Sequence, residues 1–158
     1  MRILIIYDSQ YGNTEKIAQA IGAALREKGE VEFSRVGESK VDQLKGAGLL
    51  IIGSPTQQFR ATQTMRAFLN TIPKNGLKGM KVAAFDTRLT QGIIDQNKAL
   101  SFFESIFGYA AERIAKTLKE KGGELVAPGE AFFVVGMEGP LVAGEVERAA
   151  AWAGKLFA

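Results

Sequence analysis

Hydrophobic and polar positions along the chain alternate between two patterns. Short, nearly continuous aliphatic runs, such as RILIIYD at residues 2–8 and GLLIIGSP at 48–55, are typical of parallel strands buried on both faces. VEFSRV (31–36), KVAAFDT (81–87) and ELVAPGEAFFVV (124–135) are predicted as three further strands, the last one interrupted around Pro128 and Gly129. The pattern therefore predicts a parallel sheet of five strands.

Between these runs, apolar residues recur at helical spacing. One predicted helix starts near residue 13 and ends before Gly29, a second covers 65–72, and a third covers 110–118. The buried face of the last helix is expected to consist of Val146, Ala149, Ala150, Ala153, Leu156 and Phe157. A further apolar stripe, at Phe102, Phe103, Ile106 and Phe107, is interpreted as a cover over the core. Alternating strands and helices predict one α/β domain over residues 1–158, with helices on both faces of the sheet.

Composition narrows the chemistry that the side chains can perform. The chain contains no cysteine and no histidine, which excludes thiol chemistry and disulfides and removes the usual general base and zinc ligand. We therefore expect no catalytic residue and no metal site, and any chemistry would come from a bound cofactor. The apolar N-terminal run is too short to span a membrane and lacks a signal-cleavage pattern, so a soluble, cytoplasmic protein without membrane contact is expected.

The net charge of +3 is unevenly distributed. Residues 43–85 contain no Asp or Glu. The same interval holds Lys45, Arg60, Arg66, Lys74, Lys78 and Lys81. This distribution predicts a positive local face, but it lacks the dense basic clusters with interleaved aromatic residues that bind nucleic acid, so no nucleic-acid partner is expected.

The turn SQYGNT, residues 9–14, joins the first predicted strand to the first helix. Unpaired N–H groups and the positive end of the helix dipole make such a position suitable for a phosphate. Gly12 allows the backbone to approach the anion closely, and Ser9, Asn13 and Thr14 add polar side chains. Because the turn lacks the lysine of a nucleotide-binding loop, it suits a single phosphate better than a triphosphate. From the local pattern alone, simple capping of the helix by Asn13 or Thr14 is an equal alternative.

SQYGNT also resembles the flavodoxin phosphate loop, usually written [ST]-x-T-G-N-T. IIGSPTQQFRATQTMRAFLN, residues 51–70, resembles the third strand and flavin-ring loop of flavodoxin-like proteins, and FDTR, GELV and GPL follow in the family's order. The resemblance covers the whole chain. It implies an α/β, flavodoxin-like three-layer sandwich with a five-stranded parallel sheet in the order 2-1-3-4-5, and noncovalent FMN at the carboxyl ends of the strands.

The resemblance implies that three loops of this chain bind FMN. The phosphate would lie among Ser9, Gln10, Tyr11, Gly12, Asn13 and Thr14. One side of the flavin ring would be lined by Pro55, Thr56, Gln57, Gln58 and Phe59, with Phe59 as the stacking partner. The other face would be covered by Asp86, Thr87, Arg88 and Leu89.

Three features depart from the family pattern. Tyr11 stands where the family has threonine, and no aromatic residue between Phe85 and Phe102 replaces the tyrosine that usually stacks on the second flavin face. That face is expected to be covered by Leu89 or to be open to a substrate. Residues 54–69 also lack the glycine whose peptide commonly bonds the reduced flavin, so weaker stabilisation of half-reduced flavin is expected.

Arg60, Arg66 and Arg88 are predicted to form a positive rim around the flavin, which would attract an acidic redox partner or the phosphates of a nicotinamide cofactor. Asp8 is expected to order the phosphate loop by accepting hydrogen bonds from backbone N–H groups. The leading hypothesis is an FMN-binding electron carrier that exchanges electrons with a redox protein or a small acceptor, as a monomer or homodimer. The alternatives are a flavin-dependent NAD(P)H quinone or FMN reductase, and a binding module that has lost tight flavin binding.

Overall fold

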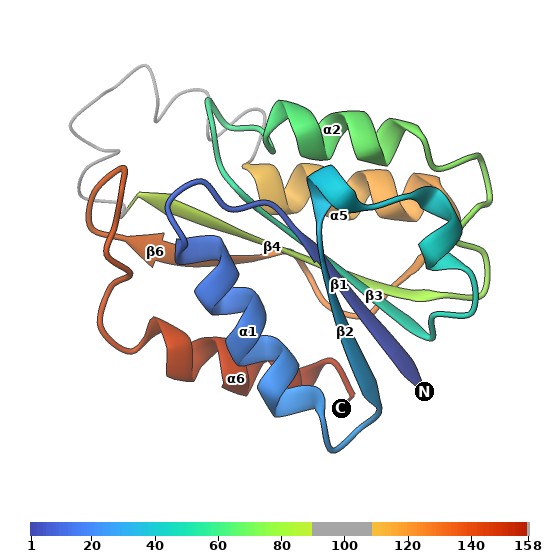
Figure 1. Ribbon diagram of the computed structural model, residues 1–158, viewed down its shortest axis with the longest axis horizontal. Coiled ribbons are helices and arrows are strands. Elements are labelled where there is room, and N and C mark those ends of the chain that lie inside the picture. Colours follow the sequence, from blue (N-terminus) through green and yellow to red (C-terminus); the bar gives the residue numbers. More distant parts are fainter. Residues whose placement is uncertain (90–108, 158) are drawn as a thin grey trace.

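The computed structural model describes residues 1–89 and 109–157, which form three layers (Figure 1). Helices α1 (Asn13–Leu25) and α6 (Glu145–Lys155) cover one face of a central sheet, and α2 (Gln63–Asn70) and α5 (Ala110–Glu120) cover the other. The connection from β2 to β3 contains two short 3-10 helices, η1 (Val36–Glu38) and η2 (Val41–Leu44). The Phe102–Phe107 stripe lies outside the described residues.

The sheet has six strands. They are β1 (Arg2–Tyr7), β2 (Glu30–Arg35), β3 (Leu49–Pro55), β4 (Lys81–Leu89), β5 (Glu124–Leu125) and β6 (Glu130–Val134). Their order is β2-β1-β3-β4-β5, every pair is parallel, and β6 also pairs with β4. Two short strands thus share the edge position beside β4, which confirms both the predicted order and the predicted interruption at Pro128 and Gly129.

Each face of the sheet buries its own apolar layer. In β1, Leu4 and Ile6 face the layer under α2 and α5, whereas Ile3 and Ile5 face the layer under α1 and α6. This double burial explains why the strand is aliphatic at every position rather than at every second one. An edge-to-face cluster of Phe85, Phe132 and Trp152 lies in the second layer, with ring centroids 6.0 to 6.3 Å apart.

One predicted core face is corrected by the structure. Val146 is 42% exposed, whereas Trp152, which the predicted face omits, is buried. Helix α6 is therefore rotated so that its single tryptophan packs on the sheet. Within the described residues, no helix is both long enough and apolar enough to cross a membrane.

Candidate functional site

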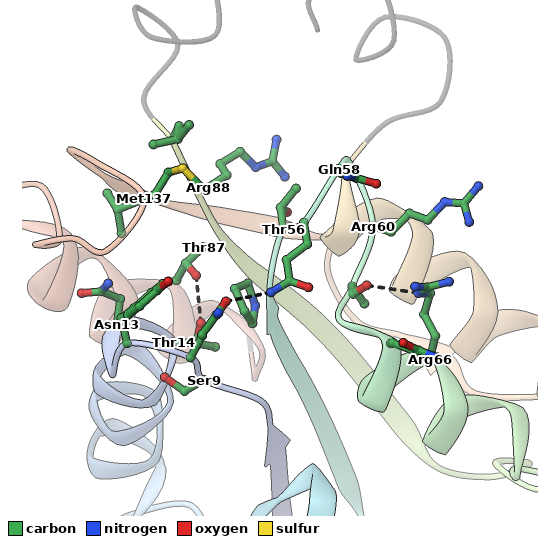
Figure 2. A pocket seen from close by; sticks show the side chains of 18 residues that line it. Ser9, Asn13, Thr14, Thr56, Gln58, Arg60, Arg66, Thr87, Arg88 and Met137 are labelled. Carbon is green, nitrogen blue, oxygen red and sulfur yellow. Dashed lines mark hydrogen bonds between the residues drawn. The ribbon is translucent and has the colours of Figure 1, made fainter.

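A cavity of about 770 Å³ opens where β1, β3 and β4 end (Figure 2). Its walls bring together most of the residues predicted to bind a cofactor: Ser9, Gln10, Tyr11, Asn13, Thr14, Pro55, Thr56, Gln57, Gln58, Thr87, Arg88 and Leu89. Six further lining residues carry no prediction as cofactor ligands: Arg60, Ala61, Gln63, Arg66, Val134 and Met137. Val134 and Met137 belong to the end of β6 and the turn after it, and their position beyond a parallel strand is the signal that identifies them.

The first loop presents unpaired backbone donors to this cavity. Helix α1 begins at Asn13, and its N-cap is Gly12 at φ 91° with no side-chain capping bond. Within the part of the chain that the structure describes, the N–H groups of Gln10, Tyr11, Asn13 and Thr14 have no acceptor. Capping by Asn13 or Thr14 is therefore wrong, and the loop offers four donors at a helix N-terminus, as an anion site requires.

The polar side chains of this loop hold its shape. Ser9 Oγ accepts hydrogen bonds from the N–H groups of Gly12 and Glu15, at 3.1 and 3.3 Å. The Thr14 and Thr87 hydroxyls lie 2.8 Å apart and join the loop to the end of β4. Because the side chains support the loop from within, its backbone N–H groups remain available to a ligand.

Asp8 connects the first loop to the second. One carboxylate oxygen accepts from the Ser9 N–H at 2.9 Å, and the other accepts from the Thr62 hydroxyl at 2.6 Å. The same hydroxyl accepts from the Met65 N–H at 3.2 Å and so caps α2. The predicted role of Asp8 in ordering the loop is confirmed, and the carboxylate also fixes the start of α2.

The second loop is a tight hairpin turn. Gln57 and Arg60 exchange two backbone hydrogen bonds of 2.7 and 3.0 Å, and the two residues between them have positive φ, 50° at Gln58 and 69° at Phe59. The Gln57 side-chain amide donates to the Gln10 side-chain oxygen at 2.8 Å, bridging the two loops. A turn with two positive φ values usually carries Asn or Gly, so this loop is built against local preference.

Thr56 provides an independent indication of a ligand. Its hydroxyl is buried, and Thr56 lines the cavity; the hydroxyl has no hydrogen-bond partner among the residues that the structure describes. A buried hydroxyl without a partner is unfavourable by about 1–3 kcal/mol, and a polar ligand in the cavity would supply the missing bond.

Three predicted cofactor residues do not line the cavity: Gly12, Phe59 and Asp86. Gly12 acts through its backbone as the N-cap of α1. The Phe59 ring packs on Tyr109, with centroids 5.5 Å apart and planes inclined by 51°. Asp86 is completely buried beneath Arg88. The stacking role of Phe59 stays a prediction.

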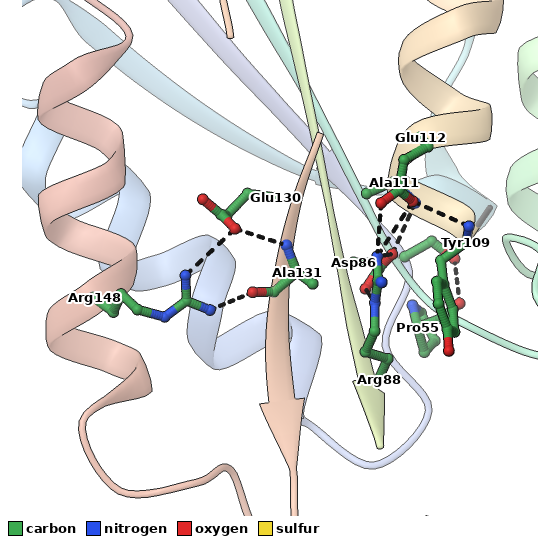
Figure 3. Close-up of polar contacts among 10 residues, drawn as sticks. Pro55, Asp86, Arg88, Tyr109, Ala111, Glu112, Glu130, Ala131 and Arg148 are labelled. Carbon is green, nitrogen blue, oxygen red and sulfur yellow. Dashed lines mark hydrogen bonds and ion pairs between the residues drawn. The ribbon is translucent and has the colours of Figure 1, made fainter. Parts of the chain in front are cut away.

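Arg88 lies in a polar network behind the cavity wall (Figure 3). Its guanidinium donates to both carboxylate oxygens of Asp86, at 2.8 and 2.6 Å, lies 3.8 Å from the centroid of the Tyr109 ring, and contacts Glu112 at 3.3 Å. The Ala111 N–H also donates to Asp86, at 2.8 Å. All three arginines of the predicted rim line the cavity, but Arg88 is paired with Asp86 and Glu112, and only Arg60 and Arg66 are exposed.

Burial and hydrogen bonding have opposite effects on the pKa values of Asp86 and Arg88. Burial raises the pKa of the Asp86 carboxyl, and the hydrogen bonds from Arg88 and the Ala111 N–H oppose that increase. Burial also acts against the charged Arg88 side chain, but the hydrogen bonds to Asp86 outweigh it and raise the pKa of Arg88. Arg88 therefore stays charged and held in place at the cavity wall.

The electrostatic character of the cavity follows from its lining. Among the described residues, the walls contain three arginines and no carboxylate. No group of three or more acidic residues that would hold a metal ion occurs in the part of the chain described. The arrangement suits an anionic organic ligand that needs no metal.

Comparison with known proteins agrees with this geometry. Residues 5–152 match the family model described as Flavodoxin. A flavodoxin from Clostridium saccharobutylicum is 29% identical over 89 residues, covering 55% of this chain and 56% of that protein. An NAD(P)H dehydrogenase (quinone) from Caulobacter vibrioides is 29% identical over 115 residues, covering 57% of this chain and 58% of that protein. The matched segments thus span little more than half of these relatives.

The fold likeness extends over the entire chain. The crystal structure of oxidised Flavodoxin 1 from Bacillus cereus superimposes with a TM-score of 0.76 at 19% identity, covering 99% of this chain and 97% of that one. This superposition agrees with the observed sheet order and with the family match. The chain belongs to the flavodoxin family.

Proposed function

We propose that this protein binds FMN in the 770 Å³ cavity and transfers electrons between that flavin and a redox partner. The observation that carries the proposal is the set of four N–H groups, in the first loop and the first turn of α1, that have no acceptor within the described part of the chain. They lie at the end of a cavity large enough for a cofactor. FMN would supply the redox chemistry, since the chain has neither cysteine nor histidine to perform it.

The residues present suit the parts of FMN. The backbone donors of the first loop and the dipole of α1 fit the phosphate, which carries the negative charge. The Thr56 hydroxyl, which lacks a partner, and the polar side chains of Gln57 and Gln58 fit the flavin ring and its polar edge. Arg88, held in place by Asp86, lies at the third wall, where its guanidinium would donate hydrogen bonds to the flavin.

Binding of FMN and of riboflavin separates the phosphate loop from the rest of the site. We expect FMN to bind at least about 100-fold more tightly than riboflavin, because loss of the phosphate forfeits several charge-assisted hydrogen bonds. Titration of flavin fluorescence with apoprotein measures both affinities. Equal affinities would contradict the assignment of the loop.

Two glycines offer a matched pair of variants. Gly12 and Gly144 each cap a helix at nearly the same φ, 91° and 88°, and each has open space around the position of a Cβ atom. Gly12→Val and Gly144→Val therefore impose the same backbone strain, about 1–3 kcal/mol. Only Gly12→Val should weaken FMN binding, by tenfold or more as an order of magnitude; weakening by both variants would show a general loss of folded protein.

Electron transfer itself needs a separate measurement. The FMN-loaded protein, reduced anaerobically with dithionite and freed of excess reductant, should be reoxidised by cytochrome c, with each electron lost by the flavin gained by one haem iron. Failure of the bound flavin to exchange electrons would refute the carrier function while leaving FMN binding intact.

A second candidate function is the reduction of quinones by NAD(P)H, and the Caulobacter relative with that name is the observation that favours it. In this case NADPH would transfer a hydride to the bound flavin, and the flavin would pass two electrons to a quinone together with two protons, one from the hydride and one from solvent. Rapid anaerobic bleaching of the flavin by NADPH, followed by quinone-dependent reoxidation, would establish this activity. Absence of bleaching would favour the carrier.

A further inference from the structure

A second concavity adjoins the FMN cavity. It is a groove of about 390 Å³ between α2 and α5, and it shares Arg60, Ala61 and Arg66 with the cavity. Its other lining residues are Leu69, Asn70, Arg113, Ile114, Lys116, Thr117 and Glu120. The residues of the described chain that surround it include four cations and a single carboxylate. We refer to it as the basic groove.

Most cations of the basic groove have no carboxylate partner among the described residues. Within the described residues, Arg60, Arg66 and Lys116 have no carboxylate within 4 Å. By contrast, Arg2, Arg35, Arg88 and Arg148 each form an ion pair. Three cations without a carboxylate partner among the described residues thus lie together beside the FMN cavity.

The positions of these side chains are defined. Arg66 Nε donates to the Ala61 carbonyl at 3.2 Å, which holds the guanidinium at the edge of the groove. In Figure 2, Arg60 and Arg66 lie on the far side of the Gln58 turn from Thr14 and Thr87, and they point away from the phosphate loop. Arg60 and Arg66 thus lie where the FMN cavity meets the basic groove, away from the phosphate loop, and are accessible to a partner at this edge.

The floor of the groove shows what kind of contact it can make. Ala61, Leu69 and Ile114 are at most 4% exposed, so little apolar surface is available to an occupant. Recognition must come from charge at the rim, and this kind of recognition acts on the rate of encounter between macromolecules more than on their final affinity.

We propose that the basic groove is the docking site of an acidic redox partner protein. The proposal rests on the electron-transfer function, because it places the partner's redox centre beside the cavity that holds the flavin. Each electron that enters the flavin is lost by that centre, or the reverse, and no further reactant is needed. The occupant is identified by charge complementarity: clustered carboxylates would pair with the groove cations that have no carboxylate partner among the described residues.

A charge-inverting variant and a matched control test the proposal. Asn70→Glu with Lys116→Glu places negative charge on both walls of the groove, on residues that do not line the FMN cavity. Gln19→Glu with Lys28→Glu makes the same change of net charge at exposed positions on or just after α1, over the opposite face of the sheet. FMN affinity is measured first for all proteins.

The reaction is the reduction of FMN-loaded protein by a pre-reduced acidic [2Fe–2S] ferredoxin, followed by flavin absorbance in a stopped-flow instrument. At about 10 mM ionic strength, the groove variant should react at least about tenfold more slowly than wild type, and the difference should shrink to within about twofold near 0.5 M. The control variant should remain within about twofold of wild type throughout. With basic cytochrome c as acceptor, the groove variant should be the faster protein at low salt.

Three results would overturn the inference. Equal slowing of both variants would assign the effect to net charge, and rates independent of ionic strength would exclude electrostatic docking. Complete loss of the wild-type advantage on adding millimolar pyrophosphate, at constant ionic strength, would identify the groove as a small-anion site. In each case, a flavin that still exchanges electrons leaves the proposed function standing, whereas a protein that binds no FMN refutes that function instead.

Discussion

Removing the charge of Asp86 should destabilise the protein strongly. Asp86 is completely buried and accepts three hydrogen bonds, two from Arg88 and one from the Ala111 N–H. Asp86→Asn keeps the size of the side chain but leaves the Arg88 guanidinium, whose side chain is only 9% exposed, without its bidentate partner. Breaking a buried ion pair on one side costs about 3–5 kcal/mol.

The surroundings of Arg88 affect this magnitude. Glu112 lies 3.3 Å away but its side chain is 50% exposed, so it is a weak substitute for Asp86. We therefore expect a loss of about 3–5 kcal/mol out of a total stability of roughly 5–15 kcal/mol, with the fold retained in most of that range. For a domain of this size, the melting temperature should fall by roughly 6–20 °C.

Urea denaturation of the apoprotein, followed by circular dichroism, measures the effect without added stabilisation from a ligand. A double-mutant cycle with Arg88→Gln isolates the pair: the double variant should be more stable than the sum of the single effects predicts, by about 1–3 kcal/mol. A cost below about 1 kcal/mol for Asp86→Asn, or strict additivity, would refute the account of a buried, mutually dependent pair.

Two further predictions concern packing and pH. In Gly53→Ala the new Cβ would lie 2.0 Å from the ring of Phe85. We therefore expect the free energy of unfolding, measured by urea denaturation, to fall by about 1–3 kcal/mol. The control Gly154→Ala, in open space on α6, should be neutral or stabilise by up to about 1 kcal/mol. Hydrogen bonding to Arg148 lowers the pKa of Glu145 below its usual 4.5. Because the pKa is lower in the folded state than in the unfolded state, the Glu145 carboxylate stabilises the fold above about pH 4.5. This contribution disappears as the pH falls through the folded-state pKa. Below that pH, the free energy of unfolding should therefore fall less steeply in Glu145→Gln than in wild type. An unchanged pH profile would contradict the assignment.

The elements that depend on local pattern were predictable from the sequence. The aliphatic strands, the turn at residues 9–14 and the interrupted last strand all follow from residues that are adjacent in the chain. Ion pairs and hydrogen bonds between side chains that are far apart in the sequence were not predictable. Arg88 has the sequence position of a cation at the rim, but its pairing depends on Asp86 two residues earlier and on Tyr109 and Glu112 later in the chain.

The orientation of α6 about its own axis also could not be predicted from the spacing of its apolar residues. Val146 and Trp152 are both apolar residues on α6. Trp152 is the one buried, because its indole fits the space beside Phe85 and Phe132. The basic groove illustrates the same limit. The interval without acidic residues predicted a positive face, but only the packing of α2 against α5 brings Lys116 to the same groove as Arg66.

The hydrogen bonds of Asp8 have a thermodynamic consequence. One carboxylate holds the Ser9 N–H and the Thr62 hydroxyl, and the Gln57 and Gln10 side chains make a second link between the same two loops. The two sides of the site are thus tied together by bonds that need no cofactor. Binding should therefore forfeit little conformational entropy, and the heat capacity change on adding the cofactor should reflect buried surface alone, with no contribution from loop folding.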